Sequence, residues 1–195
     1  MQAQRITVAQ LHSIPEYESI RFDMRRRAVA LRKARRVKVG DRVTFVFENR
    51  DTMLFQIHEV IRVEGVTDPE LLQAECEVYN ALLPSRHELA ATLIIEPRCA
   101  ASVREELTAL AGIDEHSHIR LGNEVIAAEI DRGHSAEERI ATVQTVRFRF
   151  DDAQRELACD CATPMWLCLD HARYTAQARL EGPTRAAICA DLGVG

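Results

Sequence analysis

The sequence predicts an α+β fold, with a mixed or antiparallel sheet of about five to seven strands and flanking helices in one domain over residues 1–195. Apolar residues recur at helical spacing mainly in the first half of the chain. The second half holds mostly segments of alternating polarity joined by short connections, which favours a sheet with helices packed on it. The sequence also lacks GxGxxG and GxxxxGK[ST], the phosphate-binding motifs of nucleotide folds.

Apolar periodicity and breaker residues predict the elements in order. Helices are expected at residues 7–12, 16–37, 52–62, 69–80, 100–111, 151–158 and 183–193. Strands are expected at residues 43–47, 92–96, around 119, 125–130, 142–150, 165–170 and 174–180. Residues 131–138, which include Gly133 and Ser135, are expected to form a mobile loop.

Composition indicates a protein without membrane insertion. Hydrophobic residues make up 47% of the chain, yet no apolar run approaches the roughly 20 residues that a membrane-spanning helix needs. The N-terminal segment lacks the apolar core and cleavage site of a secretory signal, so a cytoplasmic location is expected. In that reducing compartment the six cysteines are expected to be free thiols.

A polar cluster at residues 48–52 stands between the buried strand and the next helix. The cluster can supply helix caps and ion pairs. It can also supply a binding pocket, because the planar guanidinium of Arg50 suits a carboxylate or phosphate. The candidate ligand-binding residues are Glu48, Asn49, Arg50, Gln56, Glu59, His171 and Tyr174.

An enzyme that acts on a small anionic metabolite is the alternative use of this pocket. It requires the early and late segments of the chain to meet, so that a carboxylate such as Glu59 lies near His171. His171 is then the natural proton carrier near neutral pH, with Asp170 to orient it. No spacing in the sequence establishes that the two segments meet, and no catalytic residue is assigned.

Two groups of residues have the right types for metal binding. Cys159, Cys161, Cys168 and His171 fall within thirteen residues, but their spacing differs from the paired CxxC of structural zinc sites. His116 and His118, beside Asp114 and Glu115, form a second set, although exposed turn residues are commoner than ligands. Packed or surface side chains are therefore the favoured interpretation of both sets, and no metal or other cofactor is expected.

Positive charge is concentrated in one segment of this acidic chain. The net charge is −5, whereas residues 21–42 contain ten basic and two acidic residues. Arg21, Arg25, Arg32 and Arg36 are expected to line one side of the long helix without aromatic neighbours. This side can be a solvated face or a docking surface for an acidic protein. Nucleic-acid binding is disfavoured by the missing aromatics and the overall charge.

Several segments of the chain resemble a known bacterial family. They are FENRDTMLFQIHEVIR at residues 47–62, Glu75 with YNALLP at 79–84, ATLIIE at 91–96, and Asp170, His171 and Tyr174. In this order they resemble the family named domain of unknown function 3501. Members commonly carry proline after the Asp-His pair, where this chain has Ala172. The family occurs beside rubrerythrin-like proteins and iron–sulfur subunits of the heterodisulfide reductase type, which implies a redox setting.

Together the residues and the resemblance predict an accessory or binding protein. The resemblance implies an iron–sulfur or rubrerythrin-like protein as partner, and the Arg-rich helix offers a docking surface for it. An enzyme for a small anion is the first alternative. A nucleic-acid-binding module that uses the Arg-rich helix is the second.

Overall fold

The computed structural model describes residues 5–130 and 142–193. The expected mobile loop at residues 131–138 lies outside these described residues. In the described part of the chain, no helix is long and apolar enough to cross a membrane.

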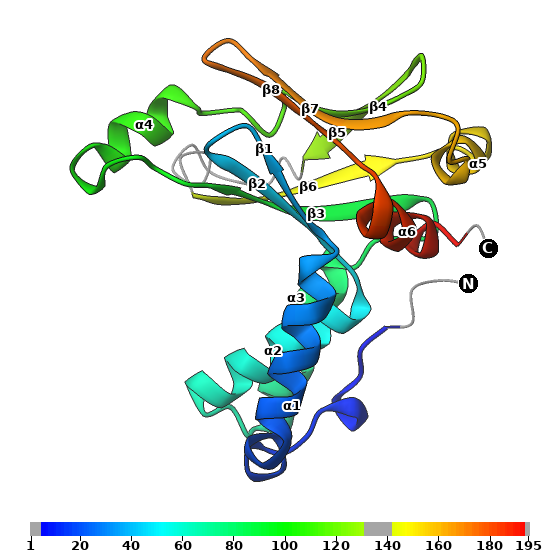
Figure 1. The fold of residues 1–195 in the computed structure, drawn as a ribbon. Helices are drawn as coiled ribbons and strands as arrows, with labels where there is room; N and C mark the ends of the chain where they lie inside the picture. Colours follow the sequence, from blue (N-terminus) through cyan, green and yellow to red (C-terminus); the bar gives the residue numbers. More distant parts are fainter. Residues whose placement is uncertain (1–4, 131–141, 194–195) are drawn as a thin grey trace.

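Helices and strands follow the expected α+β order (Figure 1). The helical elements are η1 (Val8–Gln10), α1 (Ile14–Lys33), α2 (Arg50–Glu64), α3 (Pro69–Leu82), η2 (Ala100–Ser102), α4 (Val103–Ala109), α5 (Asp152–Cys159) and α6 (Gly182–Asp191). The strands are β1 (Arg36–Val39), β2 (Val43–Glu48), β3 (Glu88–Ile95), β4 (Ser117–Leu121), β5 (Glu124–Ile130), β6 (Val143–Arg149), β7 (Met165–His171) and β8 (Tyr174–Arg179).

One antiparallel sheet holds the eight strands of residues 5–130 and 142–193, in the order β1-β2-β3-β6-β5-β4-β7-β8. The sheet curls until its two edge strands, β1 and β8, approach each other (Figure 1). The predicted α+β class is confirmed, and the antiparallel option is the one observed. The predicted five to seven strands were too few, because β1 was assigned to the end of the long helix.

Strand β1 forms where the sequence predicted the last turn of the Arg-rich helix. Helix α1 ends at Lys33, and the following residues alternate between exposed Arg36 and Lys38 and buried Val37 and Val39. This period-two burial suits β-branched valine on a strand. Pairing with β2 therefore overrides the helical periodicity of the preceding residues.

The curled sheet encloses the larger of two apolar cores. On β2, Val43, Phe45 and Phe47 point into it, and each is almost fully buried. Leu93 on β3 and Phe148 on β6 face the same interior, as the period of two requires for neighbouring antiparallel strands. This core makes the sheet a rigid support for the elements at its ends.

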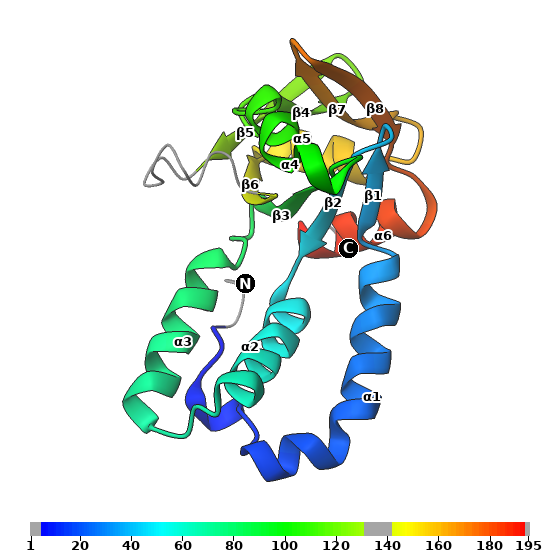
Figure 2. The same ribbon diagram turned by 90° about the vertical axis from the view of Figure 1, so that its left-hand side faces the viewer.

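Helices α1, α2 and α3, with η1, form a helical arm that projects from the sheet (Figures 1 and 2). The arm has a separate core to which α2 contributes Met53, Ile57 and Ile61 and α3 contributes Cys76. Helix α1 takes little part in that core, because only Tyr17 and Ala28 of its 20 residues are buried. Most of the α1 surface is consequently open to solvent.

Candidate functional site

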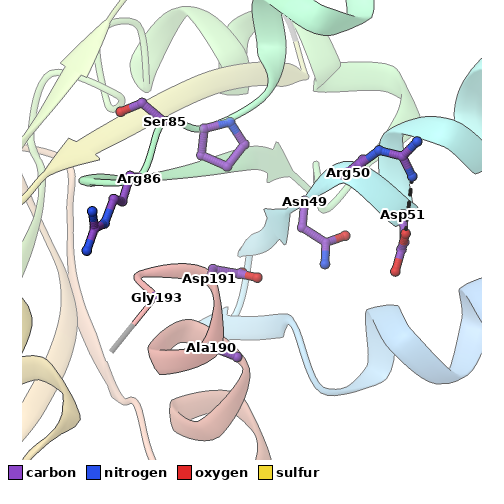
Figure 3. A pocket seen from close by; sticks show the side chains of 9 residues that line it. Asn49, Arg50, Asp51, Ser85, Arg86, Ala190, Asp191 and Gly193 are labelled. Atoms are coloured by element: carbon purple, nitrogen blue, oxygen red, sulfur yellow. Dashed lines mark ion pairs between the residues drawn. The ribbon is translucent and has the colours of Figure 1, made fainter. Parts of the chain in front are cut away.

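A polar cleft lies where the helical arm joins the sheet. Its volume is about 440 Å³. The lining comes from the start of α2, the loop before β3 and the end of α6 (Figure 3). These segments contribute Asn49, Arg50, Asp51, Pro84, Ser85, Arg86, Ala190, Asp191 and Gly193. Of the predicted ligand-binding residues, Asn49 and Arg50 lie in this cleft.

Asn49 begins α2 through a capping box. Its Oδ1 accepts a hydrogen bond from the Thr52 backbone N–H at 3.1 Å, and the Thr52 hydroxyl oxygen accepts from the Asn49 N–H at 2.9 Å. The capping interpretation of the polar cluster therefore holds for Asn49. The same geometry places the positive end of the α2 dipole at the cleft, where it favours an anion.

The positive charge at the cleft comes from two arginines on different segments. Arg50 is half-buried and lies 3.9 Å from the carboxylate of Asp51. Arg86 is exposed, and the structure shows no hydrogen bond or ion pair for its side chain among the described residues. The Arg50 guanidinium is turned toward Asp51, so the Arg86 guanidinium is the group better placed to donate paired hydrogen bonds to a phosphate or carboxylate (Figure 3).

Asp191 brings negative charge to the cleft, but Arg35 balances it. The two guanidinium nitrogens of Arg35 donate to the Asp191 carboxylate at 2.5 and 2.9 Å. The side chains are 5% and 12% exposed, respectively. A buried bidentate pair of this kind joins the end of α6 to the segment after α1 and forms a firm wall for the cleft.

Glu48 lies beside the start of α2 but does not line the cleft. It is buried, and its Oε1 accepts hydrogen bonds from the Thr92 hydroxyl at 2.9 Å and from Gln56 Nε2 at 3.4 Å. Its Oε2 is buried and has no hydrogen-bond partner within the described structure. Glu48 and Gln56 were both predicted as ligand-binding residues, and the contact between them holds α2 on the sheet.

Glu59 joins α1 to α2. Tyr17 donates its hydroxyl hydrogen to Oε1 at 2.7 Å, and Arg21 donates to both carboxylate oxygens at 2.8 and 2.9 Å. The Arg21 hydrogen bond is the main cause that lowers the pKa of Glu59 to about 2. Both carboxylate oxygens of Glu59 thus accept hydrogen bonds within the protein. Glu59 therefore forms a structural ion pair and is not an open ligand-binding group.

His171 and Tyr174 lie at the other end of β2 from Glu48. The Tyr174 hydroxyl donates to the Val39 carbonyl at 2.8 Å and accepts from the Arg42 N–H at 3.0 Å, just before β2 begins. Glu48 is the last residue of β2. The expected convergence of the early and late segments is corrected here, because six strand residues at about 3.3 Å each separate the two groups.

His171 instead lies beside a histidine from the segment before β4. Its ring centroid is 5.3 Å from that of His116, and its Nδ1 accepts from the Arg173 N–H at 3.2 Å. Burial and the neighbouring His116 lower the pKa of His171. Asp170 points to another partner, with its carboxylate 3.7 Å from Nε2 of His118. The predicted Asp170–His171 proton relay is therefore not assembled.

The metal candidates are dispersed as well. Among the residues that the structure describes, no three or more His, Cys, Asp or Glu side chains are grouped as a metal site. Cys168 is buried on β7, and Cys161 is exposed after α5. Cys159 is near Cys189 of α6, whose thiol donates to the carbonyl of Ala158 at 3.3 Å.

The basic residues of α1 divide between two faces. Arg21 turns inward to Glu59, and Arg32 lies over the Phe55 ring at 6.0 Å. Arg36 is on β1, 3.3 Å from Glu96. The expectation that these three share one side with Arg25 is therefore wrong, since it assumed a helix that continues to residue 37. Only Arg25 of the predicted partner-binding set faces outward on α1.

The outer face of α1 carries a different set of residues, which we call the outer stripe. Its members lie on one face of the helix and are exposed: Phe22, Arg25, Arg26, Val29 and Lys33. The expectation of a basic face without aromatics is corrected by Phe22, which is 79% exposed. Arg26 forms an ion pair with Asp23 at 3.1 Å.

Sequence reasoning missed Ser85, Arg86 and Asp191 of the cleft. Pro84 indicates the end of α3, but a helix end gives no indication of what the next residues face. The sequence indicates Asp191 only as part of a terminal helix. An exposed arginine after a helix stop is a weak signal, and nothing local reveals that α6 packs against Arg35.

An antiparallel α+β sheet protein with a helical arm and a polar cleft is therefore the class that fold and site define. The model of the family described as protein of unknown function (DUF3501) matches residues 5–192, and the chain belongs to this family. The chain is also similar to a crystal structure of a protein of unknown function from Burkholderia pseudomallei K96243. Identity is 28%, the TM-score is 0.90, and the match covers 97% of this chain and 100% of the other. Comparison with curated proteins gave no match.

Proposed function

We propose that this chain is a binding protein that docks an acidic partner protein on the outer stripe of α1. The observation that carries the proposal is the exposure of Phe22 and Val29 at 79% and 63% between basic side chains. Apolar residues that stay exposed on a helix contribute little to the folding of the chain. Packing within this chain therefore does not explain why Phe22 and Val29 are apolar. Association with a partner would bury them.

Charge defines the partner that suits the outer stripe. Arg25 and Lys33 have no ion pair among the described residues, and they lie about two helical turns apart on either side of Val29. An acidic surface with a central apolar residue matches this arrangement, because rim charges steer association while buried apolar contacts supply affinity. The family resemblance favours an iron–sulfur or rubrerythrin-like protein as this partner.

Affinity purification from the native host under anaerobic conditions tests the proposal. The tagged chain is compared with the double variant Arg25→Glu, Lys33→Glu, and co-purifying proteins are identified by mass spectrometry. The matched control is Arg104→Glu, which reverses an exposed charge on α4. We expect an acidic iron-containing protein with the tagged chain and the control, and at least a tenfold loss with the double variant.

Three results would contradict the docking proposal. One is a partner that the double variant retains at the level of the control. Another is recovery of the chain with RNA, released by ribonuclease and lost with the double variant, which would assign the outer stripe to nucleic acid. The third is recovery of the chain alone.

The cleft supports a second candidate function, the binding of a small anion. Arg50, Arg86 and the start of α2 meet at one cavity of about 440 Å³, although they come from separate segments. Phosphate and carboxylate both suit this donor set. The enzymatic alternative receives less support, because His171 lies at the other end of β2 and no histidine is among the described residues that line the cleft.

Titration with inorganic phosphate and with citrate, followed by calorimetry and by thermal denaturation, tests the second candidate. Arg86→Ala should weaken binding of the effective anion at least tenfold and leave the melting temperature of the free protein within about 1 °C, since the side chain is exposed. Arg104→Ala serves as the matched control. Equal binding by both variants would exclude Arg86 from an anion site.

A further inference from the structure

Two cysteines lie near each other where α5 packs against α6. Cys159 is the last residue of α5 and Cys189 is in the second half of α6. The Cys189 thiol donates to the carbonyl of Ala158, the residue directly before Cys159, at 3.3 Å. Residues 30 positions apart in the sequence are thus brought together by tertiary packing.

Two buried arginines hold the two helices in this arrangement. Arg185 of α6 donates from Nε to the Ala158 carbonyl at 2.5 Å and from Nη2 to the Asp160 carbonyl at 3.0 Å. Arg155 of α5 donates from Nε to the Leu192 carbonyl at 3.0 Å. The backbone that carries both cysteines is consequently held in place before any reaction.

The pair is accessible to a small reagent. Cys159 and Cys189 are each partly exposed, whereas Cys76 and Cys168 are buried. Burial and the neighbouring thiol raise the pKa of Cys159 to about 12. Because the thiolate is the reactive form, oxidation that begins at Cys159 is slow at neutral pH and becomes faster as the pH rises.

We propose that Cys159 and Cys189 are a redox-active dithiol that a small peroxide oxidises to a disulfide between α5 and α6. One thiolate attacks hydrogen peroxide, which gives a sulfenic acid and, after protonation of the leaving hydroxide, one water. The second thiol then displaces the sulfenic oxygen as a second water and forms the S–S bond. Two thiols and one peroxide thus yield one disulfide and two waters.

The disulfide would act on the polar cleft. Cys189 is two residues before Asp191, which lines the cleft and pairs with Arg35. A covalent bond from Cys189 to α5 would fix the last turn of α6 and therefore one wall of the cleft. This inference is independent of the docking proposed for the outer stripe.

Peptide mapping of the full chain provides the test. The reduced protein is treated with hydrogen peroxide, remaining thiols are alkylated, and the chain is digested with an endoproteinase that cleaves before aspartate. The cut before Asp160 separates Cys159, in peptide 152–159, from Cys161, while Cys189 falls in peptide 170–190. We expect these two peptides to be joined, with the bond reversed by dithiothreitol and formed faster at pH 9 than at pH 7.

Matched variants and thermal denaturation complete the test. Cys161→Ser should retain the cross-link, whereas Cys189→Ser should abolish it. The oxidised wild-type chain should melt about 5 °C or more above the reduced chain, because the bond closes a loop of some 30 residues. The wild-type chain alone can overturn the proposal. It would do so if Cys159 and Cys189 were both alkylated after peroxide treatment, or if the disulfide used Cys161 instead.

Discussion

The hydroxyl of Tyr174 occupies the space where a Cβ atom on Gly40 would lie. Gly40 has φ of +72°, a backbone conformation that L side chains rarely adopt, so it turns the chain between β1 and β2 and leaves room for the tyrosine ring. From this position Tyr174 at the start of β8 hydrogen-bonds to Val39 at the end of β1. The two residues thereby hold together the edge strands of the curled sheet.

Tyr174→Phe should destabilise the protein by about 1–3 kcal/mol. It removes one hydroxyl that satisfies both the Val39 carbonyl and the Arg42 N–H, and a buried polar group without a partner costs about that much. Urea denaturation measures the change. Tyr79→Phe is the control, because the Tyr79 hydroxyl has no hydrogen bond within the described residues. Equal losses in the free energy of unfolding for the two variants would contradict a stabilising role of the Tyr174 hydroxyl.

Gly40→Ala should be destabilising for two reasons that a double-mutant cycle separates. The positive φ costs roughly 1–2 kcal/mol for an L residue, and the new methyl group collides with the Tyr174 hydroxyl. Removal of the hydroxyl relieves part of that collision. The loss in the double variant with Tyr174→Phe should therefore be smaller than the sum of the single losses by at least about 0.5 kcal/mol. Additive losses would argue against the contact.

Glu59→Gln should lower the free energy of unfolding by about 1–3 kcal/mol at pH 7, because it removes the carboxylate that Arg21 and Tyr17 share. The pKa of Glu59 falls to about 2 in the folded protein from an ordinary value of 4.5. Its contribution is therefore complete above about pH 4.5 and is lost as the pH falls toward 2. The difference between wild type and variant should narrow between pH 7 and pH 3.

Chemical denaturation at both pH values measures this narrowing. Glu156→Gln supplies the control, since Glu156 is exposed and its carboxylate has no partner among the described residues. A difference between wild type and Glu59→Gln that stays constant from pH 7 to pH 3 would mean that the Glu59 charge contributes nothing to stability.

Arg185→Lys should destabilise the protein by about 2–3 kcal/mol although it keeps the positive charge. The guanidinium reaches three backbone carbonyls at the end of α5, including Ala158 and Leu157, and a single ammonium cannot replace this geometry. Arg179→Lys is the control, because that side chain is 55% exposed and its pair with Glu181 should be worth less than about 1 kcal/mol. Similar losses of stability for Arg185→Lys and Arg179→Lys would contradict the proposed role of the Arg185 guanidinium.

Alternation and periodicity in the sequence were sufficient to predict the α+β class and seven of the eight strands. They succeeded on β2 because the apolar residues Val43, Phe45 and Phe47 recur at every second position of the sequence, as expected for a strand, although all six residues of β2 are buried. They failed on β1, where the competing helical pattern of α1 continued into residues whose valines pair with β2. Strand pairing is a non-local interaction, and local periodicity carries no information about it.

The candidate site likewise contains contacts that the sequence predicts and contacts that it does not. The cap at Asn49 depends on Thr52, three residues away, and the sequence was enough to indicate it. The meeting of Asp191 with Arg35 joins residues separated by 156 positions, and no local pattern predicts it. The candidate pocket required His171 to lie near Glu48, but the two lie at opposite ends of β2. Local chemistry thus specified the elements and their caps, whereas the curl of the sheet decided which side chains share a cleft.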